Sequence, residues 1–198
     1  MNTCRAGVDS SSDSYSRPAP ARPPLLPQGL ITANVASALS VDELGNTPLH
    51  ALCNQRSVTF DLVEKYLCLA PGAAHVANNR GRTVLHHIAG NDALGGSRCA
   101  TIIAAIAAAY PGSALALDDI GATPLHNLCA NMGVTPASLS ALISFAPAAV
   151  DVVSQWGRTP LRTLCENPSL STSLLADFVA TAPGAFKSWV GVASSASR

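Results

Sequence analysis

Apolar residues recur along the chain in short stripes whose spacing is typical of helices buried on one side. After Pro48 the stripe consists of Leu49, Leu52 and Cys53, at positions i, i+3 and i+4. A polar break follows, and then a longer apolar face begins. The pattern predicts a short helix, for example over 48–54, followed by a helix of about twelve residues. The longer face consists of Leu62, Val63, Tyr66 and Leu67 here, and of Leu139, Leu142, Ile143 and Phe145 further along.

This unit returns because one phrase returns four times. The phrase reads Gly45-Asn-Thr-Pro-Leu-His50, Gly81-Arg-Thr-Val-Leu-His86, Gly121-Ala-Thr-Pro-Leu-His126 and Gly157-Arg-Thr-Pro-Leu-Arg162. The glycines are 36, 40 and 36 residues apart, and a second mark at Pro71, Pro111, Pro147 and Pro183 follows each of them. A fixed period in this range indicates a repeat array, in which stacked units share one core and the usual task is binding.

Cap residues predict where the helices begin. A threonine stands in each phrase where its hydroxyl can accept from the open amides of the first turn. Proline follows in three of the four phrases, at a position where a missing N–H costs nothing. The second helices are predicted to begin at Thr59, Ser97, Thr135 and Ser171 or Thr172, and to end at the proline marks. The four extra residues of the second unit are assigned to the loop around 92–97.

The phrase Gly-x-Thr-Pro-Leu-His at the start of a helical pair, with Asp42 and Asp118 three residues before a glycine, resembles the ankyrin repeat. The resemblance covers roughly residues 35–189. It implies helix pairs stacked side by side, loops projecting from one edge, and a concave face that binds proteins. The chain departs from the family in its longer period, in Leu-Cys where Ala-Ala is usual, and at Val84 and Arg162 within the phrase. A HEAT-like or tetratricopeptide-like array is the alternative fold.

We therefore predict an all-α fold, an ankyrin-like helical repeat solenoid of helix-turn-helix pairs with projecting loops. It has four full repeats, over 41–76, 77–116, 117–152 and 153–189 of a domain spanning 41–190, plus an N-terminal half-repeat. The half-repeat is degenerate and covers 29–40, because residues 35–45 parallel residues 111–121. Residues 1–28, rich in Ser and Pro, and residues 191–198 are predicted to be disordered tails.

Charge and cysteine usage narrow the function classes. Twelve basic residues balance twelve acidic ones, so the basic patch expected of a nucleic-acid or acidic-membrane binder is missing from the sequence. The apolar runs are too short to cross a membrane. Cys53, Cys129 and Cys165 share one register with Ala89, which indicates buried, reduced thiols rather than disulfides. Reduced thiols favour an intracellular location, cytoplasmic or nuclear.

Two His-x-x-Cys pairs, at His50 with Cys53 and His126 with Cys129, resemble metal-ligand pairs, but they lie two repeats apart and cannot converge on one ion. No catalytic constellation or cofactor motif stands out from the repeat pattern. The chain is therefore predicted to be no enzyme and to need no cofactor. The ankyrin resemblance implies instead that each histidine bonds its threonine and nearby backbone. The residues of this structural motif are Thr47, His50, Thr83, His86, Thr123, His126 and Thr159.

Positions that vary between repeats are free to bind a partner. The slots on either side of the motif glycine differ most, and in the ankyrin arrangement they lie near the loop tips. We expect a non-catalytic interaction module or adaptor that holds a protein partner there. The alternatives are an accessory region of a larger repeat protein and, less favoured, a metal-binding or enzymatic use of His and Cys. The chain could also associate with itself end to end. The candidate partner-binding residues are Leu44, Arg80, Arg82, Ile120, Trp156 and Arg158.

Overall fold

A computed structural model of the 198-residue chain describes residues 37–94 and 96–185. These residues form α-helices and short 3-10 helices and no β-strand; one isolated antiparallel bridge joins Ala77 to Thr83. The predicted tails and residues 29–36 of the predicted half-repeat lie outside the described residues. The α-helices are α2 (Pro48–Cys53), α3 (Phe60–Leu69), α4 (Val84–Ala89), α5 (Ser97–Ala109), α6 (Pro124–Ala130), α7 (Pro136–Phe145), α8 (Pro160–Cys165) and α9 (Thr172–Thr181).

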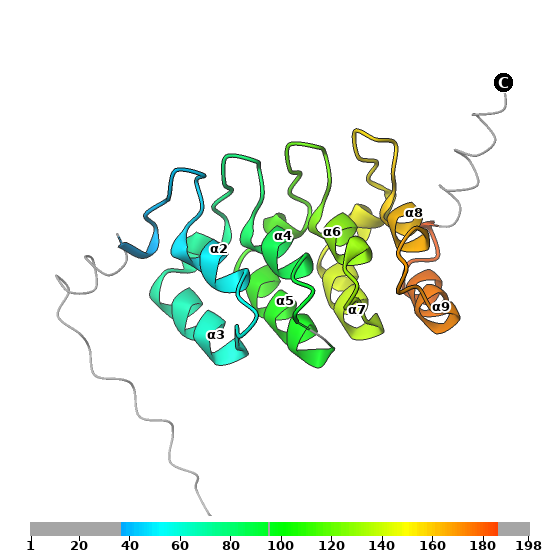
Figure 1. Cartoon of the computed structure of the whole chain (residues 1–198), viewed down its shortest axis with the longest axis horizontal. Coiled ribbons are helices and arrows are strands. Elements are labelled where there is room, and N and C mark those ends of the chain that lie inside the picture. Colours follow the sequence, from blue (N-terminus) through cyan, green and yellow to red (C-terminus); the bar gives the residue numbers. More distant parts are fainter. Residues whose placement is uncertain (1–36, 95, 186–198) are drawn as a thin grey trace, which may run out of the picture.

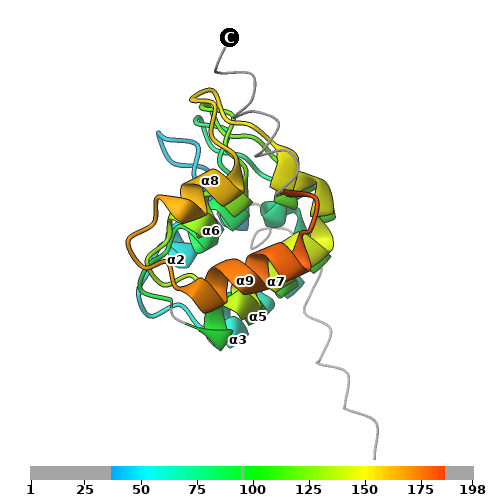
Figure 2. The same cartoon turned by 90° about the vertical axis from the view of Figure 1, so that its right-hand side faces the viewer.

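The helices stand in two layers (Figure 1). The short helices α2, α4, α6 and α8 pack on one another in order, and the longer helices α3, α5, α7 and α9 do the same in the second layer. Figure 2, seen along the row, shows the two layers, with the loops that precede the short helices projecting past one edge. The core lies between the layers and between neighbouring pairs, where side chains such as Leu85, Ile102, Leu125 and Leu142 are fully buried.

Local chemistry sets the helix ends. Thr47, Thr83, Thr123 and Thr159 are the N-caps of the short helices, as predicted. Thr59, Thr135 and Ser171 are the N-caps of three longer helices, each accepting a backbone N–H of the first turn through its hydroxyl. The longer helices stop before a proline, and a 3-10 helix follows each of the first three. These 3-10 helices are η1 (Pro71–Ala74), η2 (Pro111–Ala114) and η3 (Pro147–Asp151).

The second pair differs from its prediction. The N-cap of α5 is Gly96, with a φ of 64°, and the predicted cap Ser97 is the first helical residue. Helix α5 has 13 residues where α3, α7 and α9 have 10, so three of the four extra residues extend the helix rather than the loop. The added turn buries Cys99, and this apolar contact explains why the segment is helical.

The cysteine register is buried in the first three pairs and exposed in the last one. Cys53, Ala89 and Cys129 are fully buried, and burial raises the pKa of the Cys53 thiol to about 12. Cys165 is exposed, so the prediction was wrong for this residue. Its register faces the following pair, and no described pair follows α8 and α9. The cysteines among the described residues are all unpaired, and none of the helices in this part of the chain is long and apolar enough to cross a membrane.

Candidate functional site

A loop precedes each of the four short helices, and these loops, numbered here in chain order, share one geometry. In the second loop the Asn78 side chain accepts from the backbone N–H groups of Arg80 and Arg82, and Asp118 does the same for Ile120 and Ala122 in the third. Each motif glycine has a positive φ, which is 70° at Gly81. A Cβ on Gly81 would lie 2.9 Å from the carbonyl oxygen of Leu117, so glycine is required there by both conformation and contact.

Backbone hydrogen bonds tie each loop to the next. The Asn79 N–H donates to the Leu44 carbonyl at 2.9 Å, Asp119 to Arg80 at 2.8 Å, and Gln155 to Ile120 at 2.9 Å. The carbonyl groups that accept these bonds belong to the slot before the motif glycine. Hydrogen-bonded backbone therefore carries the variable side chains of Leu44, Arg80 and Ile120 at that slot, which lowers the entropy cost of binding there.

Three buried histidines link α2, α4 and α6 to the following loop, and together they form the His row: His50, His86 and His126. The Nδ1 atom of His86 accepts from the Thr83 N–H at 3.0 Å, and its Nε2 lies 3.1 Å from the Ala122 carbonyl oxygen. The same two contacts recur for His50, toward Arg82, and for His126, toward Arg158. The ring proton must then sit on Nε2, because Nδ1 is an acceptor.

The His row is held in the neutral state. Burial lowers the pKa of His86 to about 4, and burial also lowers the pKa of His50 and His126. Both ring nitrogens are used by the fold in all three residues. No group of three or more His, Cys, Asp or Glu side chains that could hold a metal ion gathers within 37–94 and 96–185. Each of these three histidines also contacts the hydroxyl of its own threonine.

A second row, absent from the predicted site, lies at the other end of the short helices. This Asn row consists of Asn91, Asn131 and Asn167, which the sequence showed only as a recurring residue at one register. The Asn91 Nδ2 donates to the carbonyl groups of Cys53 and Gln55 in the preceding pair, at 2.9 and 3.0 Å. Asn131 bonds Ala89, and Asn167 bonds Cys129 and Asn131, in the same way. The recurrence was the available signal, but nothing in it named the partners.

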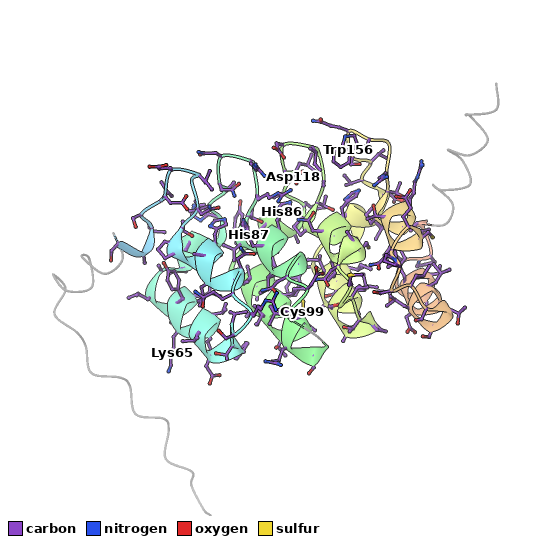
Figure 3. All side chains as sticks on the ribbon, viewed as in Figure 1. Lys65, His86, His87, Cys99, Asp118 and Trp156 are labelled. Carbon is purple, nitrogen blue, oxygen red and sulfur yellow. The ribbon has the colours of Figure 1, made fainter. Side chains whose placement is uncertain are left out.

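The predicted partner-binding residues lie in the loops but have different surroundings. Leu44 and Trp156 are 64% and 65% exposed, Arg80 is exposed, and Ile120 is half-buried. The Arg82 guanidinium lies 3.3 Å from the buried carboxylate of Asp118, so this side chain braces the next loop. Figure 3 shows Trp156 in the last loop, well separated from Lys65 on the far layer.

Ile120, Trp156 and Arg158 converge on one hollow between the third and fourth loops. Its volume is about 130 Å³, and Asn127 on α6 and Thr163 on α8 also line it. Arg158, which lines the hollow, and Arg162 both pair with Glu166, at 3.1 and 3.2 Å. Two guanidinium groups thus share one carboxylate, which leaves one positive charge in excess. Leu44, Arg80 and Arg82 do not line this hollow.

Charges on the loops alternate in sign. The first loop carries Asp42 and Glu43, the second Arg80 and Arg82, the third Asp118 and Asp119, and the fourth Arg158. Neighbouring loops therefore attract each other, and the row as a whole presents no single-sign field.

A scan of the chain against models of protein families finds no match, and a search of curated proteins finds none either.

Proposed function

We propose that this protein is a non-catalytic binding module: an ankyrin-like solenoid of four helix-pair repeats that holds a protein partner at its loop tips and short helices. The phrase carried by each loop and the two-layer stacking of helix pairs support the ankyrin assignment. The unpaired thiols support an intracellular setting, because oxidising compartments favour disulfides. The buried, fully bonded histidines support a structural role for these residues, which otherwise resemble metal ligands.

The observation that carries this proposal is the hollow at Ile120, Trp156 and Arg158. A tryptophan that is 65% exposed beside an arginine is an unusual arrangement for a free surface, and both residue types are enriched at binding hot spots. The hollow is small enough to take one apolar side chain. The excess positive charge of the group formed by Arg158, Arg162 and Glu166 complements an acidic neighbour of that side chain. The proposed partner therefore presents an apolar residue flanked by a carboxylate.

This proposal reduces the predicted surface to its C-terminal half. Arg82 is engaged by Asp118, and Leu44, on the first loop, does not line the hollow. Leu44 occupies the same slot as Trp156 and has nearly the same exposure, so it is a matched control for effects of exposed apolar area alone.

The test has two steps. A partner is first captured from native extract and identified by mass spectrometry; its affinity for the purified chain is then measured by titration calorimetry. Replacing a hot-spot tryptophan by alanine costs 2 kcal/mol or more, so Trp156→Ala is expected to weaken binding about thirtyfold. Leu44→Ala is expected to leave the affinity within about twofold, well under 1 kcal/mol.

Circular dichroism checks that both variants stay folded. Equal affinities for Trp156→Ala and the unchanged protein would place the partner elsewhere. Equal losses in both variants would show that general apolar area, and not the hollow, drives binding.

A further inference from the structure

The first helix pair exposes a set of residues that the other three pairs bury. We call this set the N-terminal face: Ser37, Pro48, Leu52, Leu62 and Tyr66. Registers are counted from the motif glycine for the short helices and from the proline mark for the longer ones. Leu62 is 48% exposed, whereas Ile102, Ser138 and Leu174 at the same register are 0%, 1% and 4% exposed. Tyr66 is half-buried, whereas Ile106, Leu142 and Phe178 are fully buried.

The same contrast holds on the short helix and at the turn. Leu52 is half-buried, but its equivalents Ile88, Leu128 and Leu164 are fully buried. Pro48 and Ser37 are exposed, whereas the residues at their registers are buried in every other described pair. The shared cause is that α4 to α9 each have a preceding pair, and α2 and α3 have none among the described residues. The N-terminal face therefore has the composition of an internal interface.

The chain itself supplies material for this interface. Residues 23–41 contain no charged residue, whereas residues 1–22 contain five. Within the uncharged stretch, Leu25, Leu26, Leu30 and Ile31 lie a short distance before the first described residue. That residue, Ser37, belongs to the N-terminal face, and the next one, Ala38, is fixed to it by a 2.6 Å hydrogen bond from the Tyr66 hydroxyl to its carbonyl. The chain upstream of Ser37 thus starts at the N-terminal face.

Reach and concentration favour this segment over a second molecule. Twelve residues extend up to about 40 Å, while the ten-residue α3 is only about 15 Å long. A tethered segment has an effective concentration of about millimolar, far above that of a second copy of the chain at ordinary protein concentrations. Tethering therefore favours the local segment even where a neighbouring molecule offers an equal contact area.

We propose that residues 24–36 cover the N-terminal face, placing Leu30 and Ile31 against Leu62 and Tyr66, and so cap the array. Residues 29–36 of this segment belong to the predicted half-repeat, and residues 24–28 to the stretch that composition alone placed in a disordered tail. It makes no use of the partner site at the other end of the molecule, so the two proposals stand or fail separately. A capping segment also removes the apolar end that end-to-end self-association would use.

The test is photo-crosslinking within the full-length chain. Leu62 is replaced by the photoreactive residue p-benzoyl-phenylalanine, which its partial exposure tolerates. Glu64 is exposed, lies about 160° around the same helix from Leu62, and lines the hollow between α3 and α5; it is replaced likewise as the control. Unlabelled and ¹⁵N-labelled chains are mixed before irradiation, so that mass spectrometry separates crosslinks within a chain from those between chains. We expect crosslinks from position 62 to residues 24–36 of the same chain, and none to that segment from position 64.

Crosslinks that join light and heavy chains would overturn the proposal in favour of a second copy, and so would crosslinks from position 62 that miss residues 24–36. A second measurement does not depend on the probe. Ile31→Asp should lower the Tm by about 4 °C relative to the unchanged chain. The charged aspartate cannot replace isoleucine in an apolar contact with the N-terminal face, so that contact is lost. Ser11→Asp, in the charged part of the same tail, should leave the Tm unchanged. Equal Tm values for the two variants would also overturn the proposal.

Discussion

The His row and the Asn row stand at opposite ends of the short helices and do the same task in opposite directions. Each histidine reaches forward to a carbonyl of the following pair, and each asparagine reaches back to carbonyls of the preceding pair. Both are buried side chains that satisfy backbone groups 32 to 42 residues away. The difference is that a histidine can take up a proton and an asparagine cannot. One row is thus sensitive to pH and the other is not.

The largest effect should come from acid. The pKa of His86 is lowered in the folded state, so the unfolded chain binds the proton more tightly, and stability present above pH 6.5 is lost as the pH falls toward 4. Asp118, Arg82 and His126 face this ring, and burial remains the leading cause. His86 alone should contribute on the order of 3 kcal/mol over that window. Urea denaturation at several pH values measures it; a flat profile between pH 6.5 and 4.5 would contradict the assignment.

Removing one ring should have the next largest effect. His86→Ala leaves the Thr83 N–H and the Ala122 carbonyl without partners in a buried site, at a cost of roughly 2–3 kcal/mol in the free energy of unfolding. The exposed His75 is the control, and His75→Ala should change stability by less than about 0.5 kcal/mol. His86→Ala should also reduce the slope of stability against pH. If the slope is unaltered, the titrating group is another residue.

Breaking the Asn row should cost less and should leave the pH profile unchanged. Asn131→Ala frees the Ala89 carbonyl and the Gly133 N–H, and we expect a loss of roughly 1–2 kcal/mol by denaturant titration at pH 7. Its dependence on pH should parallel that of the unchanged chain. A steeper or shallower profile would show that the two rows are coupled.

The smallest effect is expected where the His row stops. Arg162 holds the histidine register in α8, and no described loop follows to accept a bond from a ring there. Arg162→His should therefore change the free energy of unfolding by less than about 0.5 kcal/mol, because only the exposed pair with Glu166 is lost. A gain above 1 kcal/mol would mean that the ring has found an acceptor.

The sequence carried the local part of this arrangement well. Threonine caps and proline marks act within one or two turns, so the helix ends could be predicted from neighbours alone, except at α5, where burial of Cys99 extends the helix. Gln55 stands at the register of the Asn row in the first pair, and Arg162 at the register of the His row in the last. Among the described residues, these are the two pairs where an asparagine would have no preceding carbonyl and a histidine no following one.

The candidate site was less predictable, because it depends on contacts between repeats. The slots were identified, but the bracing of Arg82 by Asp118 and the hollow beside Trp156 arise from side chains on separate loops. A period reveals which residues are equivalent and not which of them meet. The same limit hid the exposure of Cys165, whose burial would need a neighbour on its open side.

Opposed rows of bonds also govern how the molecule opens. An inner pair can leave the stack only by breaking bonds in front of it and behind it at once, whereas an end pair breaks them on one side. Partial unfolding should therefore begin at the end pairs and proceed inward, and not start at random positions along the stack. Amide protons of α4 to α7 should exchange with solvent at rates set by global unfolding, and those of α2, α3, α8 and α9 at faster rates set by fraying. The inner pairs then behave as one cooperative block that holds the third loop steady while the last loop, with Trp156, retains the freedom of an end.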